Sequence, residues 1–495
     1  MFGLNKYFQI IIVILVKKGW CKMDIQGLFD KVKEELNNSS DLYSHIFEKS
    51  GVQIGVICLK SMTDDKLFYD GVCRPIENFD GKISHEVLSS KIIGVKEFNK
   101  IDEKEIAEKV INGFAILVTS DSDQILGVDI LSYPTRVPAE PPTSQVIQGP
   151  REGFVEDIRT NIALLRRRFY NKDFVVKQIS IGEQTQTKVA VAYLKTIANQ
   201  KIVKRILKKL NEIEIDGIID AYYIVKKMEE HPYSMFKQIG SQEKPDIVAS
   251  KLLEGKVAII VDGSPIVLTI PYVLLEDFQN SNDYYTNSTY ATLIRLVRLV
   301  GVFIAIIVPG TYLALRLFHF NVIPVNYLIT IANTTMALPF TPFIELFFIN
   351  LLFQILYEVS LRLPSYLGLA TSIVGALILG DTGVKAGLIS PPGVIIIALS
   401  KIAVYTVPEV ASQLTILQLV FLVIGGSVGL LGIIGGMIYL INYLNTIDSF
   451  GTPYLAPYSP KITADLKDGL FKSQLNEMKT RPLSFGNKTN KKRQK

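Results

Sequence analysis

The sequence predicts an α+β/α membrane protein: a two-lobed, duplicated cytoplasmic α/β domain followed by a polytopic α-helical transmembrane domain. Charged residues occur throughout residues 23–290, whereas residues 292–447 carry very few. Hydrophobic residues make up 48% of the chain, and its mean hydropathy of +0.28 is high for a soluble protein. The second region holds uncharged runs that suit a bilayer with about 30 Å of hydrocarbon. We therefore expect the soluble domain first and the membrane domain second.

Shifts in composition divide the chain further. The expected parts are an N-terminal extension at 1–44, a first α/β lobe at 45–136, a Pro-rich linker and connecting helix at 137–169, a second lobe at 170–285, a transmembrane domain at 286–447 and a basic cytoplasmic tail at 448–495. In the extension, residues 8–16 (FQIIIVILV) are apolar but too few to span a bilayer, and no small-residue cleavage site follows them. Folded structure from Met23 and a short membrane-surface anchor both remain open.

Two pairs of segments indicate that the lobes are copies of one another. Residues 54–61 (IGVICLKS) resemble residues 189–196 (VAVAYLKT), and residues 106–113 (IAEKVING) resemble residues 248–255 (VASKLLEG). The paired segments begin 135 and 142 residues apart, so the two offsets agree to within a small insertion. A repeat of this kind predicts two related α/β lobes.

Residues 149–168 (GPREGFVEDIRTNIALLRRR) predict a helix between the lobes. Gly149 and Pro150 break the preceding segment, acidic residues lie near the start and three arginines lie at the end, where the helix dipole favours them. Apolar residues recur at spacings of three and four. The helix is either a charged surface connector or an element that couples the lobes. Its candidate coupling residues are Arg151, Glu152, Glu156, Asp157, Arg159, Arg166, Arg167 and Arg168.

The predicted membrane helix 342–362 carries a polar stripe. Asn350, Gln354 and Glu358 recur every four residues on one face, and Glu345 lies near the start as a possible mouth residue. Such side chains are costly inside a membrane unless they meet water or polar partners. The stripe therefore indicates a pore or cation path, or hydrogen bonds between helices of a bundle or oligomer. These four residues are the pore-lining candidates.

The other predicted spans leave their number open. Residues 299–315 form the first span, and residues 366–380 and 386–400 are either two half-helices or one hairpin. Residues 410–447 carry no charge, and a single helix of that length would be about 57 Å long. They are either one tilted helix or two short spans. Cations before the first span and in the tail favour a cytoplasmic location for both ends of this domain. The span count is then even, either four or six.

The residue inventory predicts a protein that is not an enzyme. The four histidines are isolated, so we expect no metal site, and no GxSxG, HExxH or phosphate-loop motif occurs. Cys21, Cys58 and Cys73 lack CxxC spacing and suit a reducing compartment. The tail has ten Lys and Arg against four Asp and Glu, a net +6 on a disordered end, which disfavours nucleic-acid binding. We expect no catalytic residue and no cofactor.

The order of residues in 149–168 resembles the signature of the GerA family, the A-type subunits of nutrient germinant receptors in endospore-forming bacteria. Residues 251–265 (KLLEGKVAIIVDGSP), 361–364 (LRLP) and 450–457 (FGTPYLAP) also resemble that family, in the same order. The chain departs from the family at Gln145, where an acidic residue is usual, and at Asp381, where the family usually has Gln after Gly.

This resemblance implies a subunit of a receptor in the spore inner membrane. It implies assembly with a transporter-like B-type subunit, thought to bind the nutrient, and with a C-type lipoprotein. It also implies homo-oligomers around an ion-conducting path, in contact with membrane lipid. The alternatives are a non-conducting scaffold, an accessory spore-membrane protein of the stage V type, and a secondary transporter. The membrane half shows no repeated halves, which disfavours a transporter.

Overall fold

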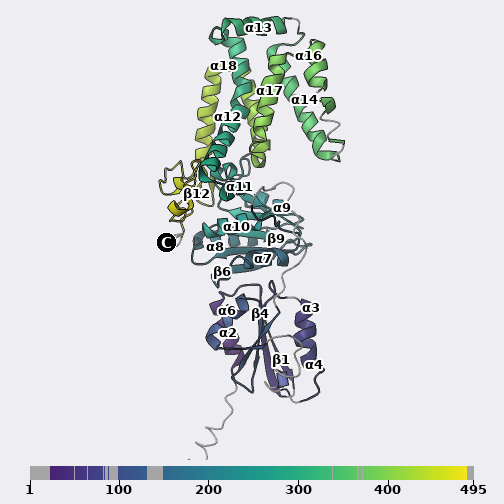
Figure 1. Cartoon of the computed structure of the whole chain (residues 1–495), viewed down its shortest axis with the longest axis vertical. Helices are drawn as coiled ribbons and strands as arrows, with labels where there is room; N and C mark the ends of the chain where they lie inside the picture. Colours follow the sequence, from purple (N-terminus) through teal and green to yellow (C-terminus); the bar gives the residue numbers. More distant parts are fainter. Residues whose placement is uncertain are drawn as a thin grey trace, which may run out of the picture.

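The computed structural model describes residues 23–49, 51–63, 65–81, 83, 87–88, 98–130, 149–336, 338–364, 367–368, 373–375 and 377–487. The predicted anchor at 8–16, the Pro-rich linker at 137–148 and Cys21 lie outside these residues. Two α/β lobes are stacked end to end below a bundle of long helices, so the molecule is elongated (Figure 1).

The first lobe is built on an antiparallel sheet with the order β1-β2-β4-β5-β3. Its strands are β1 (Leu42–Lys49), β2 (Val52–Leu59), β3 (Phe98–Ile101), β4 (Phe114–Thr119) and β5 (Ile125–Asp129). On one face lie α2 (Ile25–Glu35) and α6 (Ile106–Ile111), and on the other α3 (Asp65–Phe68), the π-helical η1 (Tyr69–Cys73) and α4 (Arg74–Asn78) (Figure 1).

The first lobe begins earlier than the predicted boundary at residue 45. Phe29 and Val32 of α2 lie in the core beside Ile57 of β2 and Ile116 of β4. Burying such side chains contributes about 1.5–3 kcal/mol each, so α2 is part of the lobe and not an extension. The apolar residues of α2 recur at helical spacing, which is the signal that marks it as a core helix.

The second lobe has the same strand order, β6-β7-β9-β10-β8, and is also antiparallel. Its strands are β6 (Phe174–Ile181), β7 (Thr187–Leu194), β8 (Gly240–Gln242), β9 (Val257–Val261) and β10 (Val267–Ile270). One face packs on α7 (Ile158–Arg166) and α10 (Pro245–Leu253), the other on α8 (Gln200–Asn211) and α9 (Ala221–Met228). The similar sequence segments fall on β2 and β7, and on α6 and α10, at equivalent places in the two lobes.

The helix α7 is an integral part of the second lobe. Ile158, Ile162 and Leu165 are buried against the sheet, in the same core cluster as Val248 and Leu252 of α10. The helix covers residues 158–166, so it is shorter than the predicted stretch 149–168. The predicted connecting helix is therefore the first helix of the second lobe, just as α2 is the first helix of the first lobe.

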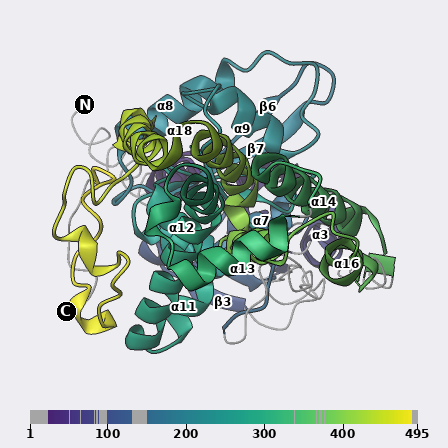
Figure 2. The ribbon, with the colours of Figure 1, turned by 90° about the horizontal axis from the view of Figure 1, so that it is seen from above.

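Among the residues that the structure describes, three helical segments are long and apolar enough to cross a membrane. They are α12 (Ser288–Phe318), α14 (Pro342–Arg362) and the segment 408–446, most of which is α18 (Ala411–Thr446). The shorter apolar helix α17 (Pro391–Val404) lies between α12 and α14. At the end far from the lobes, α13 (Val325–Thr335) runs across the bundle (Figures 1 and 2).

The helix α18 reverses direction at Gly429. This glycine has φ 76° and ψ −155°, outside the helical region. A Cβ atom at Gly436 would lie 3.2 Å from the Phe421 ring, although fifteen residues of straight helix span about 22 Å. Leu414 and Leu444, near the two ends of α18, belong to one core cluster. The two halves of α18 therefore lie antiparallel. Of the two alternatives for residues 410–447, this is the one with two short spans.

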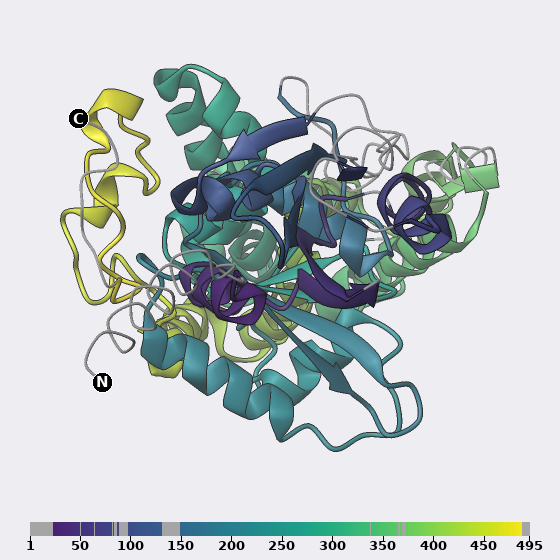
Figure 3. The same ribbon diagram turned by 90° about the horizontal axis from the view of Figure 1, so that it is seen from below.

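The tail is folded up to residue 487. The sequence-based prediction of a disordered tail is therefore wrong for these residues. It includes β11 (Asp448–Ser449), β12 (Thr452–Pro453) and the 3-10 turns η8 (Asp465–Lys467) and η9 (Leu475–Glu477). Tyr454, Met478 and Phe485 are buried, and these scattered apolar residues do not form a periodic pattern. The tail packs on one flank of the molecule, as the yellow segment in Figures 2 and 3 shows. It contacts the second lobe through Arg481, which donates to the Leu253 carbonyl, and α12 through Asp468, which pairs with Arg295.

Candidate conduction path and coupling elements

Glu345 is fully buried where α12, α14 and α17 meet. Nη1 of Arg316 donates to Oε2 of Glu345 at 3.1 Å, and the backbone N–H of Ser390 donates to Oε1 at 2.8 Å. The Ser390 hydroxyl also bonds to Oε1. Because Ser390 is the N-cap of α17, the carboxylate lies at the positive end of that helix dipole. In this chain Glu345 links three helices, rather than lying at an open mouth.

Asn350 and Gln354 lie on the side of α14 that faces the bundle. Asn350 is 4% exposed, and Gln354 is half-buried. The Gln354 Oε1 atom accepts a hydrogen bond from Nζ of Lys401 on α17 at 3.4 Å. Lys401 is 6% exposed, and among the described residues no carboxylate pairs with it. Sequence reasoning missed Lys401, although a single cation near the end of an apolar helix is a readable signal.

Glu358 lies on the exposed surface of α14. It pairs with Arg362, one turn later, with Nε of Arg362 3.0 Å and Nη2 2.6 Å from Oε1 of Glu358. The side chains of Glu358 and Arg362 are 53% and 79% exposed. Four residues advance a helix by about 400°, so a four-residue repeat drifts by about 40° per step. This drift explains why the predicted stripe begins inside the bundle at Asn350 and ends outside it at Glu358.

The helix α7 starts at a well-defined cap. Asp157 is the N-cap and accepts the backbone N–H of Thr160 at 2.8 Å, while the N–H of Ile158 donates to Asp262 in the β9–β10 turn at 3.1 Å. Four of the predicted coupling residues are exposed on the second lobe: Arg151, Glu156, Asp157 and Arg159. The two arginines at the end of the stretch, Arg167 and Arg168, pair with Glu152 near its start, Arg168 at 2.9 Å.

Arg166 is the predicted coupling residue that reaches the first lobe. Its Nε and Nη2 atoms donate to the two carboxylate oxygens of Asp41, at 3.0 and 2.9 Å. The guanidinium also donates to the Ser39 hydroxyl at 2.8 Å and to the Phe174 carbonyl at 3.0 Å. Arg166 and Asp41 side chains are 2% and 3% exposed. Asp41 precedes β1, so this bidentate pair joins the two lobes at their boundary.

The electrostatics of Asp41 follow from this enclosure. Burial alone would raise its pKa, but the charge and hydrogen bonds of Arg166 outweigh burial and hold the pKa below its usual value. Hydroxyl groups of Ser39 and Ser61, at 2.6 and 2.8 Å, assist in the same direction. The carboxylate is therefore ionised at neutral pH and strongly held by its partners.

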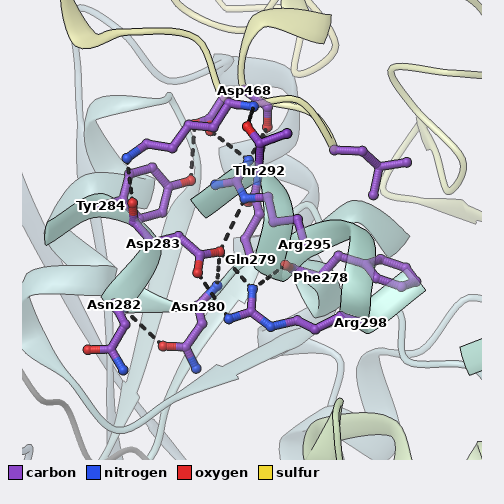
Figure 4. A network of polar contacts seen from close by, with 12 residues as sticks. Phe278, Gln279, Asn280, Asn282, Asp283, Tyr284, Thr292, Arg295, Arg298 and Asp468 are labelled. Atoms are coloured by element: carbon purple, nitrogen blue, oxygen red, sulfur yellow. Dashed lines mark hydrogen bonds and ion pairs between the residues drawn. The ribbon is translucent and has the colours of Figure 1, made fainter. Parts of the chain in front are cut away.

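A second charged cluster joins α12 to the tail (Figure 4). Arg298 makes a bidentate contact with Asp283 of α11 (Ser281–Tyr285), at 2.7 and 3.0 Å. Arg295 bridges Asp283 at 3.1 Å and Asp468 of the tail at 3.1 Å, and Tyr284 donates to Asp468 at 3.0 Å. In the sequence these arginines read only as cations beside a membrane span. Asp468 lies 173 residues away from Arg295, so no local pattern predicts the pairing.

Two adjacent carboxyl groups lie in η4 (Leu274–Phe278), at the same junction between α12 and the tail. Their pKa values are shifted in opposite directions. Burial would raise the pKa of Glu276, but Lys251 and Lys256 pair with it and lower the pKa to about 2. For Asp277, burial raises the pKa to about 7, and the Tyr272 hydroxyl donates to it. Both lysines belong to the family-like segment 251–265, which therefore has a structural role at the junction.

Comparison with known proteins identifies the family. The family model described as "Bacillus/Clostridium GerA spore germination protein" matches residues 30–484. Spore germination protein KA of Bacillus subtilis is 33% identical over 453 residues, which cover 89% of this chain and 83% of that protein. Spore germination protein B1 of the same organism is 32% identical over 466 residues, which cover 93% of this chain and 96% of the relative.

A crystal structure of a related domain also matches. It is the N-terminal domain of the A subunit of the Bacillus megaterium spore germinant receptor GerK3, with 27% sequence identity and a TM-score of 0.38. The match covers 49% of this chain and 92% of that domain. The family model and the relatives of the preceding paragraph, which match over most of the chain, confirm the resemblance seen in the sequence: the chain belongs to the GerA family of spore germination proteins.

Proposed function

We propose that this chain is the A-type subunit of a nutrient germinant receptor in the spore inner membrane. The observation that carries this proposal is the family match over residues 30–484, together with relatives named as spore germination proteins. The proposed partners are a transporter-like B-type subunit and a C-type lipoprotein. The proposed role requires no catalytic step and no cofactor.

We further propose six membrane crossings, with the lobes and tail in the cytoplasm. Ser390 at the start of α17 meets Glu345 at the start of α14, so the chain must cross back between the end of α14 and the start of α17. In support, Gly375 of this intervening stretch lies beside Leu356 of α14. The reversal at Gly429 supplies the last two crossings. Arg295, Arg298 and the basic tail lie on the lobe side, as expected for a cytoplasmic face.

The shared strand order supports the inference that the lobes arose by duplication. Each lobe begins with a helix, followed by a two-strand hairpin, helices on the opposite face, a third strand that lies at the sheet edge, a further helix and a second hairpin. The similar segments at β2 and β7, and at α6 and α10, occupy equivalent places in this order.

We propose that several copies assemble around an ion-conducting path to which α14 contributes. The helix packs on the bundle with one side and exposes Phe348, Leu351 and Ile355 on another. Half-buried Gln354 lies at the border of these two sides and exposed Glu358 lies just beyond it, where a neighbouring copy would enclose them. A polar border on a membrane helix is stable only if water or a polar partner covers it.

Ion flux from liposomes that contain the purified full-length chain tests this proposal. We expect flux from the wild type and reduced flux from the Glu358→Gln variant, which keeps the size of the side chain but removes its charge. Asp381→Asn is the matched control, because Asp381 also forms an exposed pair with a cation four residues later, Lys385 at 2.7 Å. Equal flux from all three proteins would exclude Glu358 from the path.

A non-conducting scaffold is the second candidate function. The observation that favours it is the complete engagement of Glu345 by Arg316 and Ser390, together with the burial of Asn350. These polar groups have the partners expected of structural hydrogen bonds between membrane helices. Absence of flux from well-folded oligomers that also contain the B-type and C-type subunits would support the scaffold.

A further inference from the structure

We infer that the second lobe rests on the bilayer through an aromatic patch formed by Tyr222, Tyr233 and Met235, and that its partner is the headgroup layer of the membrane. Tyr222 lies in the first turn of α9, and the other two residues lie in the loop between α9 and β8. The inference goes beyond ion conduction and relies only on the proposed membrane location of the helical bundle.

The patch consists of large side chains that the chain leaves uncovered. Tyr233 is 102% exposed, Tyr222 59% and Met235 41%. The loop alternates, since Ser234 and Phe236 point inward and are 9% and 8% exposed. Clustered exposed apolar side chains on a soluble domain commonly mark a surface that contacts a partner or a membrane.

The loop lies beside the membrane helices, at their lobe-side ends. Phe236 packs in one cluster with Val407, in the connection between α17 and α18, and with Leu414, near the start of α18. Nζ of Lys237 lies 3.6 Å from Oε2 of Glu409 in the same connection. Figure 1 shows α9 at the end of the second lobe that faces the bundle. Met235 and Tyr233, which precede Phe236 by one and three residues, are therefore held at the depth where the bundle leaves the membrane.

A hollow of about 250 Å³ adjoins the patch. Tyr222, Met235 and Lys226 line it on the lobe side, and Gln413 of α18 lines it on the membrane side. Its walls combine apolar area with ammonium, hydroxyl and amide groups. This composition suits lipid headgroups and the first carbons of acyl chains, and tyrosine itself is enriched at this depth because its ring is apolar and its hydroxyl polar.

The two lysines that line the hollow, Lys226 and Lys237, are already paired, so the contact depends chiefly on burial of apolar area. Lys226 pairs with Glu229 at 3.2 Å, and Lys237 pairs with Glu409. Asp220 caps α9 and accepts a hydrogen bond from Ser264 at 2.7 Å. A patch whose cations are already paired gains little from anionic lipid. We therefore expect binding to zwitterionic membranes as well.

Tryptophan fluorescence of the full chain in vesicles tests the inference. The chain has one tryptophan, Trp20, and Trp20→Phe gives a silent background. In phosphatidylcholine vesicles, the Tyr233→Trp variant should be quenched by lipids brominated near the headgroup and protected from aqueous iodide. The matched control is Tyr69→Trp in the first lobe, where the wild-type side chain is 52% exposed; iodide alone should quench it.

A third variant separates failure of the inference from failure of the membrane location. Ile438→Trp on α18, 56% exposed in the wild type, should be quenched by lipids brominated deeper in the acyl chain. With that signal present, quenching of the Tyr233→Trp variant by iodide alone would overturn the inference, because the patch would face water. Protection from both quenchers would also overturn it, because a protein partner would then cover the patch. Loss of the α18 signal would overturn both the inference and the membrane location.

Discussion

Removal of the Arg166 guanidinium should weaken the contact between the two lobes and lower the free energy of unfolding. In the Arg166→Met variant, Asp41 would remain buried with only the hydroxyl groups of Ser39 and Ser61 as partners. Loss of one member of a buried ion pair costs about 3–5 kcal/mol, because the other charge stays buried. A domain of 150–250 residues loses about 2–4 °C in Tm per kcal/mol. We therefore expect the Tm of the soluble domain to fall by roughly 6–20 °C.

The assay is thermal unfolding of the purified full-length chain in detergent, with two comparison proteins. Arg167→Met on the same helix leaves Glu152 paired with Arg168 at 2.9 Å, and a partly exposed pair of this kind contributes about 0–1 kcal/mol. The double variant Asp41→Leu/Arg166→Met replaces both charges with apolar groups and should regain much of the lost stability. If Arg166→Met unfolds within 2 °C of Arg167→Met (about 1 kcal/mol at most), the reasoning is refuted.

The pH dependence gives an independent check of the same pair. The pKa of Asp41 is lowered in the folded protein, so its stabilisation is present above the usual carboxyl pKa and is lost as pH falls through the folded value. In the Arg166→Met variant burial is no longer opposed by a cation, and the pKa of Asp41 should rise. The stability difference between wild type and variant should therefore shrink on acidification. A difference that stays constant from neutral to acidic pH would contradict this assignment.

Three further outcomes are expected. Gly425→Ala should destabilise the bundle in thermal unfolding, since its Cβ would clash with the Gly310 carbonyl, whereas Gly435→Ala should be neutral because nothing lies within 4 Å. Asp277→Asn should stabilise the protein above pH 7 and have little effect below pH 4, because the raised pKa of about 7 means that stability is lost as pH rises through it; an unchanged pH profile would contradict this. Lys401→Met should shift the ion selectivity of any current towards cations, measured as a reversal potential in a salt gradient.

The parts of this fold that local patterns predict are those in which neighbours in sequence determine the structure. The shift in charge near residue 290 predicts the division into soluble and membrane regions, and the similar segments at β2 and β7 point to two lobes with one strand order. The apolar spacing of α2 is equally readable. Its position next to the ambiguous segment 8–16 obscured its membership of the first lobe.

The parts that escape prediction depend on contacts between distant residues. Arg166 and Asp41 are 125 residues apart, and Arg295 and Asp468 are 173 residues apart, so neither pair leaves a periodic signal. The reversal of α18 is hidden for another reason. Several glycines follow one another between residues 425 and 436, and only the three-dimensional packing selects Gly429 as the bend.

The most direct test of the proposed conduction path is the current through the full chain in a planar bilayer before and after a charged, water-soluble thiol reagent. Cys58 and Cys73 are buried, and Cys21→Ser removes the remaining thiol. In this background, the reagent should change the current of the Gln354→Cys variant and leave that of Ile355→Cys unchanged, because Ile355 is 49% exposed on the apolar side of α14. An unchanged current in a labelled Gln354→Cys variant would contradict a path along the polar border of α14.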